Sequence, residues 1–357
     1  MKDLSFSQQI NRAIDDSMAS DQNVLCFGLG VTDPKAVFGT TYGLEQKYGP
    51  VRVFDMPTSE NAMTGVAIGM SLAGYKPVMT HQRLDFFLLA MDQLVNSAAK
   101  YHYMFGGQVS VPITIRLILG RGWGQGPTHS QNLQSWFAHI PGLKVVAPTT
   151  PLDAYYLLKE SIQDPNPVVF LEHRWLHNNT DELVLNKAPL SIGNSTYISS
   201  GSTVTVVSSS YLTIQAYKAC KYLENFSIFS DHIDLLTIKP LDIESIFQSV
   251  HKTGRLLVLD PGFETCSVGS DIIAKVTSKC WSSLKAPPQL LAMPDVPEPT
   301  SYFLTRGFYH SSAEIAKAIA NLCSHSDPNI TQSIDLEESL KEPVPHDIPG
   351  SWFSGPF

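Results

Sequence analysis

The chain has 357 residues, of which 43% are hydrophobic and 16% charged, and its formal net charge at pH 7 is -8. This length suits two domains with large apolar cores better than one domain. The negative charge, with no cluster of Lys and Arg, argues against a nucleic-acid-binding surface. No apolar run approaches the length of a membrane span, so we expect no membrane partner, and the polar N-terminus is not typical of a signal peptide.

The five cysteines are scattered without a CxxC pair, at positions 26, 220, 266, 280 and 323. An odd and unspaced set predicts reduced thiols and a cytoplasmic protein, rather than a disulfide framework or a zinc site. The small charged fraction indicates that part of the surface is buried against other subunits.

Strands alternate with helices along residues 1–175, which predicts a largely parallel sheet. The expected strands span 24–27, 51–54, 76–80, 111–119, 143–147 and 168–172. The expected helices span 6–19, a segment opened by Glu60, about 84–104, a short helix at His129 and a helix opened by Thr150-Pro151. An apolar stripe over 84–104, ended by Gly106-Gly107, supports the long helix.

A polar and irregular stretch over about 176–200 predicts a linker. A second alternating unit follows, with expected strands at 203–208, 233–238, 255–259 and 289–293 and helices at 211–224, 242–251, about 266–281 and 311–322. The proline-rich end of the chain lacks apolar periodicity, so we expect an extended tail that gains order against a partner. The expected domains are therefore 1–190 and 191–324, and the tail is 325–357.

Residues 53–73 carry the most informative pattern, VFDMPTSENAMTGVAIGMSLA. An apolar strand ends in the turn Pro57-Thr58-Ser59, and Glu60 then opens a helix whose small residues permit close packing. Ligands usually bind where a strand of an α/β sheet turns into a helix, and a carboxylate there suits a small heterocycle. Taken alone, the segment also fits a Glu60 that only complements the helix dipole.

Several stretches occur together in this chain: RVFDMPTSEN at 52–61, DQLVNSAAKYHYMFGGQ at 92–108, THSQ at 128–131, HIPGLKVVAP at 139–148, DPNPVVFLEH at 164–173 and IKPLDIESI at 238–246. They resemble the beta subunit of the thiamine-diphosphate-dependent 2-oxoacid dehydrogenase decarboxylases, of the pyruvate, branched-chain and acetoin types. The resemblance runs from about residue 6 to 322. It implies an α/β fold with two doubly wound domains, a transketolase-like pyrimidine-binding domain and a transketolase C-terminal domain.

The resemblance also implies roles for residues of the first domain. Glu60 stands at the position of the carboxylate that binds a pyrimidine nitrogen of thiamine diphosphate and favours the imino tautomer, whose neighbouring nitrogen takes the thiazolium proton. Phe86, otherwise a candidate for helix core, stands where an aromatic residue packs on the pyrimidine. Gln82 stands where relatives carry Met or Gln, and is expected in the same pocket.

His129, which alone would fit a helix cap, matches the family histidine that orients the 2-oxoacid and helps to transfer its acyl group to a lipoyl arm. His139 is also retained, and we interpret it as structural. The turn at 164–166 resembles the family's monovalent-cation site. Potassium would be held there by main-chain oxygens of Ile113, Ser161, Asp164 and Asn166. An ordinary proline turn without an ion remains the alternative.

The sequence contains no GDG, which begins the motif that gathers Mg²⁺ and the diphosphate in thiamine enzymes. We therefore expect half of an active site. The resemblance implies an alpha-type decarboxylase partner with the GDG…N motif, which holds Mg²⁺ and shares thiamine diphosphate with this chain. It also implies homodimerisation through the C-terminal domain and, for acyl transfer to lipoamide, a lipoyl acyltransferase core.

Three departures from the family pattern concern the site. Leu29 and Gly30 stand where relatives carry an acidic pair that is thought to link two active sites by proton transfer. Thr80-His81-Gln82 stands where pyruvate-type relatives carry Glu-Phe-Met. Arg121 and Trp123 stand in the glycine loop where small residues are common, and are candidates for reading a larger or more polar acceptor.

We therefore expect the beta subunit of a heteromeric enzyme that decarboxylates a 2-oxoacid and transfers the acyl group to lipoamide. The alternatives are a biosynthetic carboligase subunit, acting for instance on sugar or lipid precursors, and a non-catalytic scaffold. Retention of Glu60, Phe86 and His129 favours an enzyme, because a drifted pocket would be expected to lose at least one of them.

Overall fold

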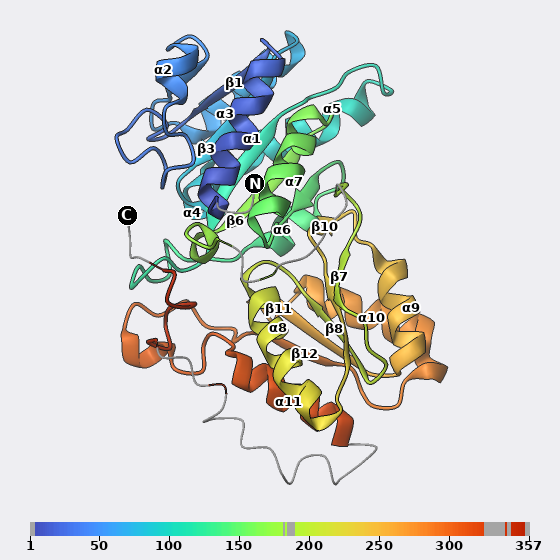
Figure 1. The fold of residues 1–357 in the computed structure, drawn as a ribbon. Coiled ribbons are helices and arrows are strands. Elements are labelled where there is room, and N and C mark those ends of the chain that lie inside the picture. The colour runs from blue at the N-terminus through green and yellow to red at the C-terminus, as the bar shows by residue number, and fades with distance from the viewer. Residues whose placement is uncertain (1–3, 181–182, 184–189, 325–339, 341–343, 354–357) are drawn as a thin grey trace.

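The computed structural model describes residues 4–180, 183, 190–324, 340 and 344–353. These residues form two α/β units, one built on the blue and green part of the chain and one on the yellow and orange part, which lie one above the other in Figure 1. Each unit has a central sheet with helices on both faces, which confirms the doubly wound class expected from the sequence.

The first sheet has the strand order β10-β5-β6-β4-β3-β1-β2, and its pairs are parallel except at β10. Side chains of its central strands β4 and β6 are buried on both faces, as near-continuous apolar runs predict for a parallel sheet. The strands are β1 (Val24–Gly28), β2 (Val53–Asp55), β3 (Lys76–His81), β4 (Thr114–Leu119), β5 (Lys144–Val146), β6 (Val168–His173) and β10 (Thr237–Lys239).

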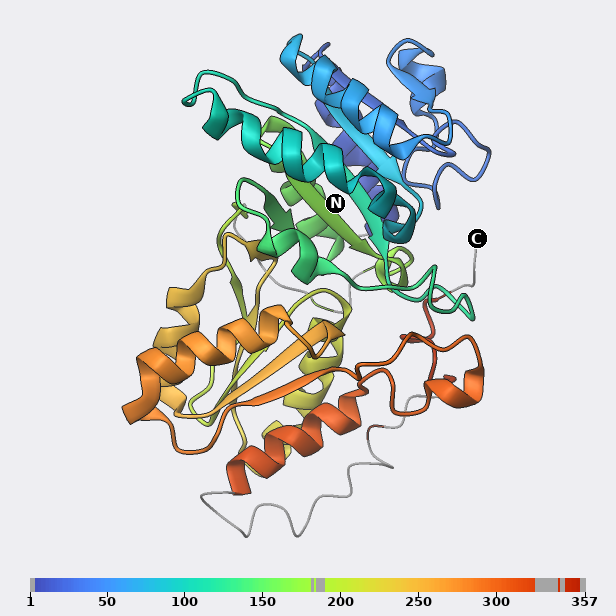
Figure 2. The same ribbon diagram turned by 180° about the vertical axis from the view of Figure 1, so that it is seen from behind.

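Helices cover both faces of this sheet. Figure 1 shows α1 and α7 on the near face, and Figure 2 shows α3 and the helical segment 84–104 on the other. The helices are α1 (Phe6–Ser20), α2 (Leu44–Tyr48), α3 (Glu60–Leu72), α4 (Leu84–Phe87), α5 (Ala99–Met104), α6 (Gln134–His139) and α7 (Pro151–Gln163), and a 3-10 turn spans Arg174–Leu176.

Two expectations for this unit need correction. The segment 84–104 is not one α-helix, because a 3-10 turn (Leu88–Ala90) and a π-helical stretch (Gln93–Ala98) separate α4 from α5. An apolar stripe does not distinguish these helix types, since each of them can bury one face. His129 does not begin a helix either, because it lies in a turn and α6 begins only at Gln134.

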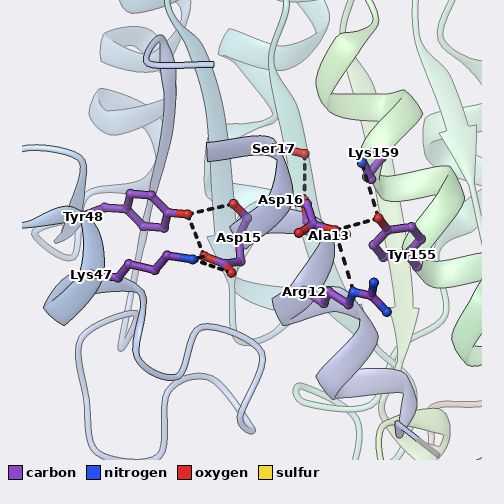
Figure 3. Close-up of polar contacts among 9 residues, drawn as sticks. All are labelled: Arg12, Ala13, Asp15, Asp16, Ser17, Lys47, Tyr48, Tyr155 and Lys159. Carbon is purple, nitrogen blue, oxygen red and sulfur yellow. Dashed lines mark hydrogen bonds and ion pairs between the residues drawn. The ribbon is translucent and has the colours of Figure 1, made fainter. Parts of the chain in front are cut away.

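Helix α1 joins two neighbours through adjacent carboxylates that point to opposite sides, as Figure 3 shows. Asp15 accepts hydrogen bonds from Lys47 and Tyr48 at 2.6 Å each, which tie α2 to α1. Asp16 accepts a 2.6 Å hydrogen bond from the Tyr155 hydroxyl on α7, and burial together with this bond raises the pKa of Tyr155 to about 12. The polar face of α1 therefore fixes its position between α2 and α7.

The start of α7 confirms the predicted helix opening at Thr150-Pro151. Thr150 and Asp153 form a reciprocal capping box, with hydrogen bonds of 3.2 and 2.8 Å between each side chain and the other backbone N–H. We expect Thr150→Ala to lower the free energy of unfolding by about 1 kcal/mol, because it removes the acceptor for an otherwise unpaired N–H. Urea unfolding measures this free energy, and Thr150→Ser should retain most of the wild-type value. Equal losses in both variants would assign the effect to methyl packing.

The second sheet has the order β12-β11-β8-β9-β7, and β7 alone among its described strands is antiparallel. Its strands are β7 (Thr196–Ser199), β8 (Val204–Ser208), β9 (Ser230–Asp234), β11 (Leu256–Phe263) and β12 (Gln289–Met293). Its helices are α8 (Tyr211–Leu223), α9 (Ile243–Thr253), α10 (Val268–Cys280) and α11 (Ser312–Ser324), with 3-10 turns at Glu224–Phe226, Trp281–Ser283 and Tyr302–Thr305.

Two further expectations were wrong. Part of the predicted linker forms β7, a short edge strand whose side chains are half-exposed, so its sequence resembles a loop. The single strand predicted over 233–238 is two strands, because the chain turns at Leu236, whose φ is +54°. Strand β9 stays in the second sheet, whereas β10 crosses to the first sheet and pairs antiparallel with β5. An apolar run does not show this change of sheet.

The predicted tail over 325–357 lies partly outside the described residues. Its described stretch, 344–353, lies against this same chain. Trp352 donates a 3.0 Å hydrogen bond to the carbonyl of Trp175, and Gln215 on α8 donates one of 3.2 Å to the carbonyl of Pro349. This stretch therefore contacts both units. Among the described residues, no helix combines the length and the apolarity needed to span a membrane.

Candidate functional site

The residues proposed for the cofactor side lie along one edge of the first sheet. Strands β2, β3 and β4 run parallel, with β1 between β2 and β3. Glu60 follows β2, Gln82 and Phe86 follow β3, and His129 follows β4. The carboxyl ends of parallel strands meet at one edge of a sheet, which is the usual binding edge of α/β proteins.

Glu60 is the first residue of α3 and is only 4% exposed. Its carboxylate has no hydrogen-bond or ion-pair partner among the described residues. The positive end of the helix dipole favours the charge but does not replace a hydrogen-bond donor. The start of α3 therefore offers a carboxylate acceptor that no described residue uses.

Phe86 and His129 are brought together although 43 positions separate them in the sequence numbering. Their ring centroids are 5.2 Å apart and the rings meet edge to face at 89°. The Nδ1 atom of His129 lies 2.9 Å from the hydroxyl of Thr128. Its Nε2 atom makes no hydrogen bond within the described ranges, so this nitrogen is available to a substrate.

The glycine loop between β4 and His129 is held at both ends by close packing. Gly120 has φ of +76° and lies against the ring of His173, where an added Cβ would be 2.1 Å from Nε2. Gly126 has φ of +73° and lies equally close to the hydroxyl of Thr300 in the second unit. Neither position tolerates a side chain, so these glycines permit the loop to pass between the two units.

Gln82 follows β3 directly and faces the loop after β1. It packs against Gly30 and lines a cavity of about 570 Å³ together with Phe38, Arg174 and His177. Glu60, Phe86 and His129 do not line this cavity. The assignment of Gln82 to the cofactor pocket therefore remains a prediction.

The loop after β1 contains Leu29 and Gly30, at the position where relatives carry an acidic pair. Asp55 accepts hydrogen bonds from the backbone N–H of Val31 at 2.7 Å and from the hydroxyl of Thr32 at 2.7 Å. Leu29 is half-buried and packs on the apolar core of the first unit. The side chain at this position therefore stabilises packing and carries no proton.

His81 is not a pocket residue. It is 1% exposed and lies edge-on to Phe87 at 4.8 Å, and burial lowers its pKa to about 3. The neutral ring is therefore part of the core beneath the site. Thr80 beside it accepts a 3.1 Å hydrogen bond from Arg116, so its side chain is also committed to the interior.

Sequence reasoning missed a buried ion pair in the centre of the sheet. Arg116 on β4 donates two hydrogen bonds, of 2.6 and 2.9 Å, to Glu172 on β6, and both side chains are fully buried. Burial alone would raise the pKa of Glu172, but the Arg116 guanidinium holds it below the ordinary value. The available signal was one basic and one acidic residue inside two apolar strands, a pattern that predicts pairing.

Arg121 is buried in the glycine loop. It is 1% exposed, donates a 2.7 Å hydrogen bond to the carbonyl of Pro299, and forms a 3.0 Å ion pair with Asp347 of the tail. Figures 1 and 2 both show the glycine loop beside the red end of the chain. Arg121 therefore joins the loop to the second unit and to the tail, and its part in acceptor recognition stays a prediction. Trp123 is 44% exposed and remains a candidate.

The proposed potassium ligands lie in two neighbouring segments. The carbonyl of Ile113 accepts from the N–H of Val168 just after the turn, and the carbonyl of Ser161 accepts from the N–H of Asp164. The Asp164 carboxylate accepts from the N–H of Asn166 at 2.9 Å and pairs with Lys144. The described residues hold no group of three or more His, Cys, Asp or Glu suited to a metal ion.

The chain matches two known domain families. Residues 2–179 match the transketolase pyrimidine-binding domain, and residues 193–314 match the transketolase C-terminal domain. Among solved structures, it is similar to a protein described as a split gene transketolase, inactive beta4 tetramer, with a TM-score of 0.73, 18% identity, and coverage of 90% of this chain and 98% of the other. This likeness shows the fold.

Curated relatives are similar over most of the chain. The pyruvate dehydrogenase E1 component subunit beta-1, mitochondrial, of Arabidopsis thaliana is 38% identical over 91% of this chain and 91% of its own. The subunit beta of an acetoin:2,6-dichlorophenolindophenol oxidoreductase from Cupriavidus necator is 36% identical over 88% of this chain and 96% of its own.

Proposed function

Because the chain belongs to the transketolase-like family of pyruvate dehydrogenase E1 and acetoin dehydrogenase beta subunits, we propose that it is the beta subunit of a heteromeric thiamine-diphosphate-dependent enzyme. The enzyme decarboxylates a 2-oxoacid and transfers the acyl group to lipoamide. The observation that carries this proposal is Glu60, a buried residue whose carboxylate has no partner among the described residues, on the sheet edge that also holds the Phe86–His129 pair.

The residues present fit the pyrimidine half of the cofactor. When bound, thiamine diphosphate supplies a nucleophilic carbon and an electron sink for decarboxylation. Glu60 would accept a hydrogen bond from the pyrimidine ring, and Phe86 would pack on it. The Nε2 atom of His129 would meet the substrate. The glycine loop before His129 contacts Thr300 of the second unit at Gly126.

The other half of the site belongs to a partner of the alpha type in this proposal. That subunit would carry the GDG…N motif and hold Mg²⁺ and the diphosphate, because the present sequence has no GDG. Homodimerisation through the second unit, a lipoyl acyltransferase core, a cytoplasmic location and potassium at the turn 164–166 complete the proposal. Because Thr80-His81-Gln82 stands where pyruvate-type relatives carry Glu-Phe-Met, activity assays must identify the 2-oxoacid and the acceptor.

We expect the isolated chain to bind thiamine diphosphate and Mg²⁺ weakly, and the complex with a GDG-bearing subunit to bind them tightly. Isothermal titration calorimetry on the chain alone and on the co-expressed complex makes the comparison. The loaded complex should release CO₂ from a 2-oxoacid, and parallel assays with lipoamide and with an aldehyde as acceptor identify the transfer reaction. Tight cofactor binding by the chain alone would overturn the division of the site between two subunits.

A further inference from the structure

A second buried acid lies close to the His129 segment and comes from the second unit. Glu298 follows β12, stands between Pro297 and Pro299, and is 1% exposed. Its Oε1 atom is 3.4 Å from the side-chain nitrogen of Asn132, three residues after His129. Its Oε2 atom is buried and has no partner in the part of the chain that the structure describes.

Among the described residues, no cation forms an ion pair with Glu298. Arg121 is the basic group that influences it, but the guanidinium is already bonded to the carbonyl of Pro299 and to Asp347. Burial of a carboxylate ion without an ion-pair partner is strongly disfavoured, so this environment favours the neutral acid. Burial and the negative charge of Asp85 raise the pKa of Glu298 to about 9, against the smaller effects of Asn132 and Arg121.

Several polar atoms of the first unit near Glu298 are also buried without a hydrogen-bond partner. Asp85 Oδ2 and Asn132 Oδ1 are buried acceptors without a partner among the described residues, and the Ser130 hydroxyl is also buried and unpaired. Asp85 already accepts a 2.8 Å hydrogen bond from Gln131. The segment 130–132 is therefore contacted by one acid from each unit, Asp85 through Gln131 and Glu298 through Asn132.

We propose that Glu298 is a positioning residue, whose neutral carboxyl group holds the segment 130–132, and with it His129, against the second unit. This inference rests on the proposed function, because it assigns Glu298 to the orientation of the substrate-side histidine. Its other titratable neighbours are Asp85 on the first unit, Arg121 on the glycine loop, Tyr211 on α8 and Tyr309 before α11.

Thermal unfolding of the full chain at several pH values tests the neutral state. An unfolded Glu298 ionises above its ordinary value of 4.5, whereas the folded chain keeps the proton up to about 9. Wild-type stability should therefore fall as pH rises between these two values. Glu298→Gln removes this loss, so its Tm should exceed that of the wild type by a margin that widens from pH 6 to pH 8. Exposed Glu264→Gln is the matched control, and a constant margin for Glu298→Gln would contradict the neutral acid.

The positioning role is tested on His129 itself. In NMR spectra of histidine-labelled full chain, Glu298→Ala should shift the His129 ring signal, and Glu298→Gln should restore it. In the assembled enzyme, Glu298→Ala should slow acyl transfer by about 10- to 100-fold, as misplacement of a catalytic group does. Glu298→Gln should rescue the rate and remove a loss of activity near pH 9. An unchanged His129 signal in Glu298→Ala would overturn this inference, whereas a wild-type complex inactive toward every 2-oxoacid would overturn the proposed function alone.

Discussion

Replacing Glu60 by glutamine should lower the turnover of the assembled enzyme by about 10²–10⁴-fold, the usual contribution of general acid–base assistance. Glutamine has the same shape but carries no charge and is a much weaker proton acceptor. The carboxylate has no partner among the described residues, so its removal leaves no buried donor unpaired and the fold should persist. Steady-state rates and circular dichroism of the co-purified complex measure the two effects.

A matched control separates this role from the helix dipole. Glu244 lies in the first turn of α9, is exposed, and stands far from the sheet edge that holds Glu60. Glu244→Gln should change stability by a few tenths of a kcal/mol, as expected for a surface charge near a helix N-terminus, and should leave turnover unchanged. Wild-type turnover in Glu60→Gln would reduce Glu60 to the same role as Glu244.

The sequence predicted the fold where periodicity and helix caps agree. The pair Thr150-Pro151 predicted the start of α7, and the structure has the capping box of Thr150 and Asp153 there. The errors in the predicted strands occur where tertiary contacts determine the secondary structure. Strand β10 leaves its own unit for β5, and its three residues carry no signal of that destination. Within the described part of the sheet, strand β7 has one strand partner, so little apolar pattern is required of it.

The relative positions of the proposed site residues also follow from tertiary structure. Phe86 and His129 follow adjacent parallel strands, so their meeting follows from the order of β3 and β4. The contacts of Arg121 could not be predicted, because its partners, Pro299 and Asp347, come from distant parts of the chain. Glu298 gave only a weak signal, an acid between two prolines, since its burial depends on how the second unit packs against segment 130–132.

Replacing His129 by alanine should slow acyl transfer far more than exchange of the thiazolium proton in the assembled enzyme. Histidine can carry or donate a proton near neutral pH, and loss of such a group typically costs about 10²–10⁴-fold in the step it assists. The geometry supports a substrate-side position, because Nδ1 contacts Thr128 while Nε2 has no partner within the described residues. Glu60 remains in place for cofactor activation, so proton exchange should continue.

Two rates measured on the same preparation distinguish a role of His129 in acyl transfer from a role in cofactor activation. Proton exchange into deuterated buffer reports cofactor activation, and single-turnover transfer to lipoamide reports the later step. His139→Ala is the matched control, because this histidine is exposed at the end of α6 and should affect neither rate. Both rates are compared at saturating substrate, so that a change in substrate affinity does not enter the comparison. Equal losses in both rates would place His129 in cofactor activation, and no loss in either would leave it as part of a turn.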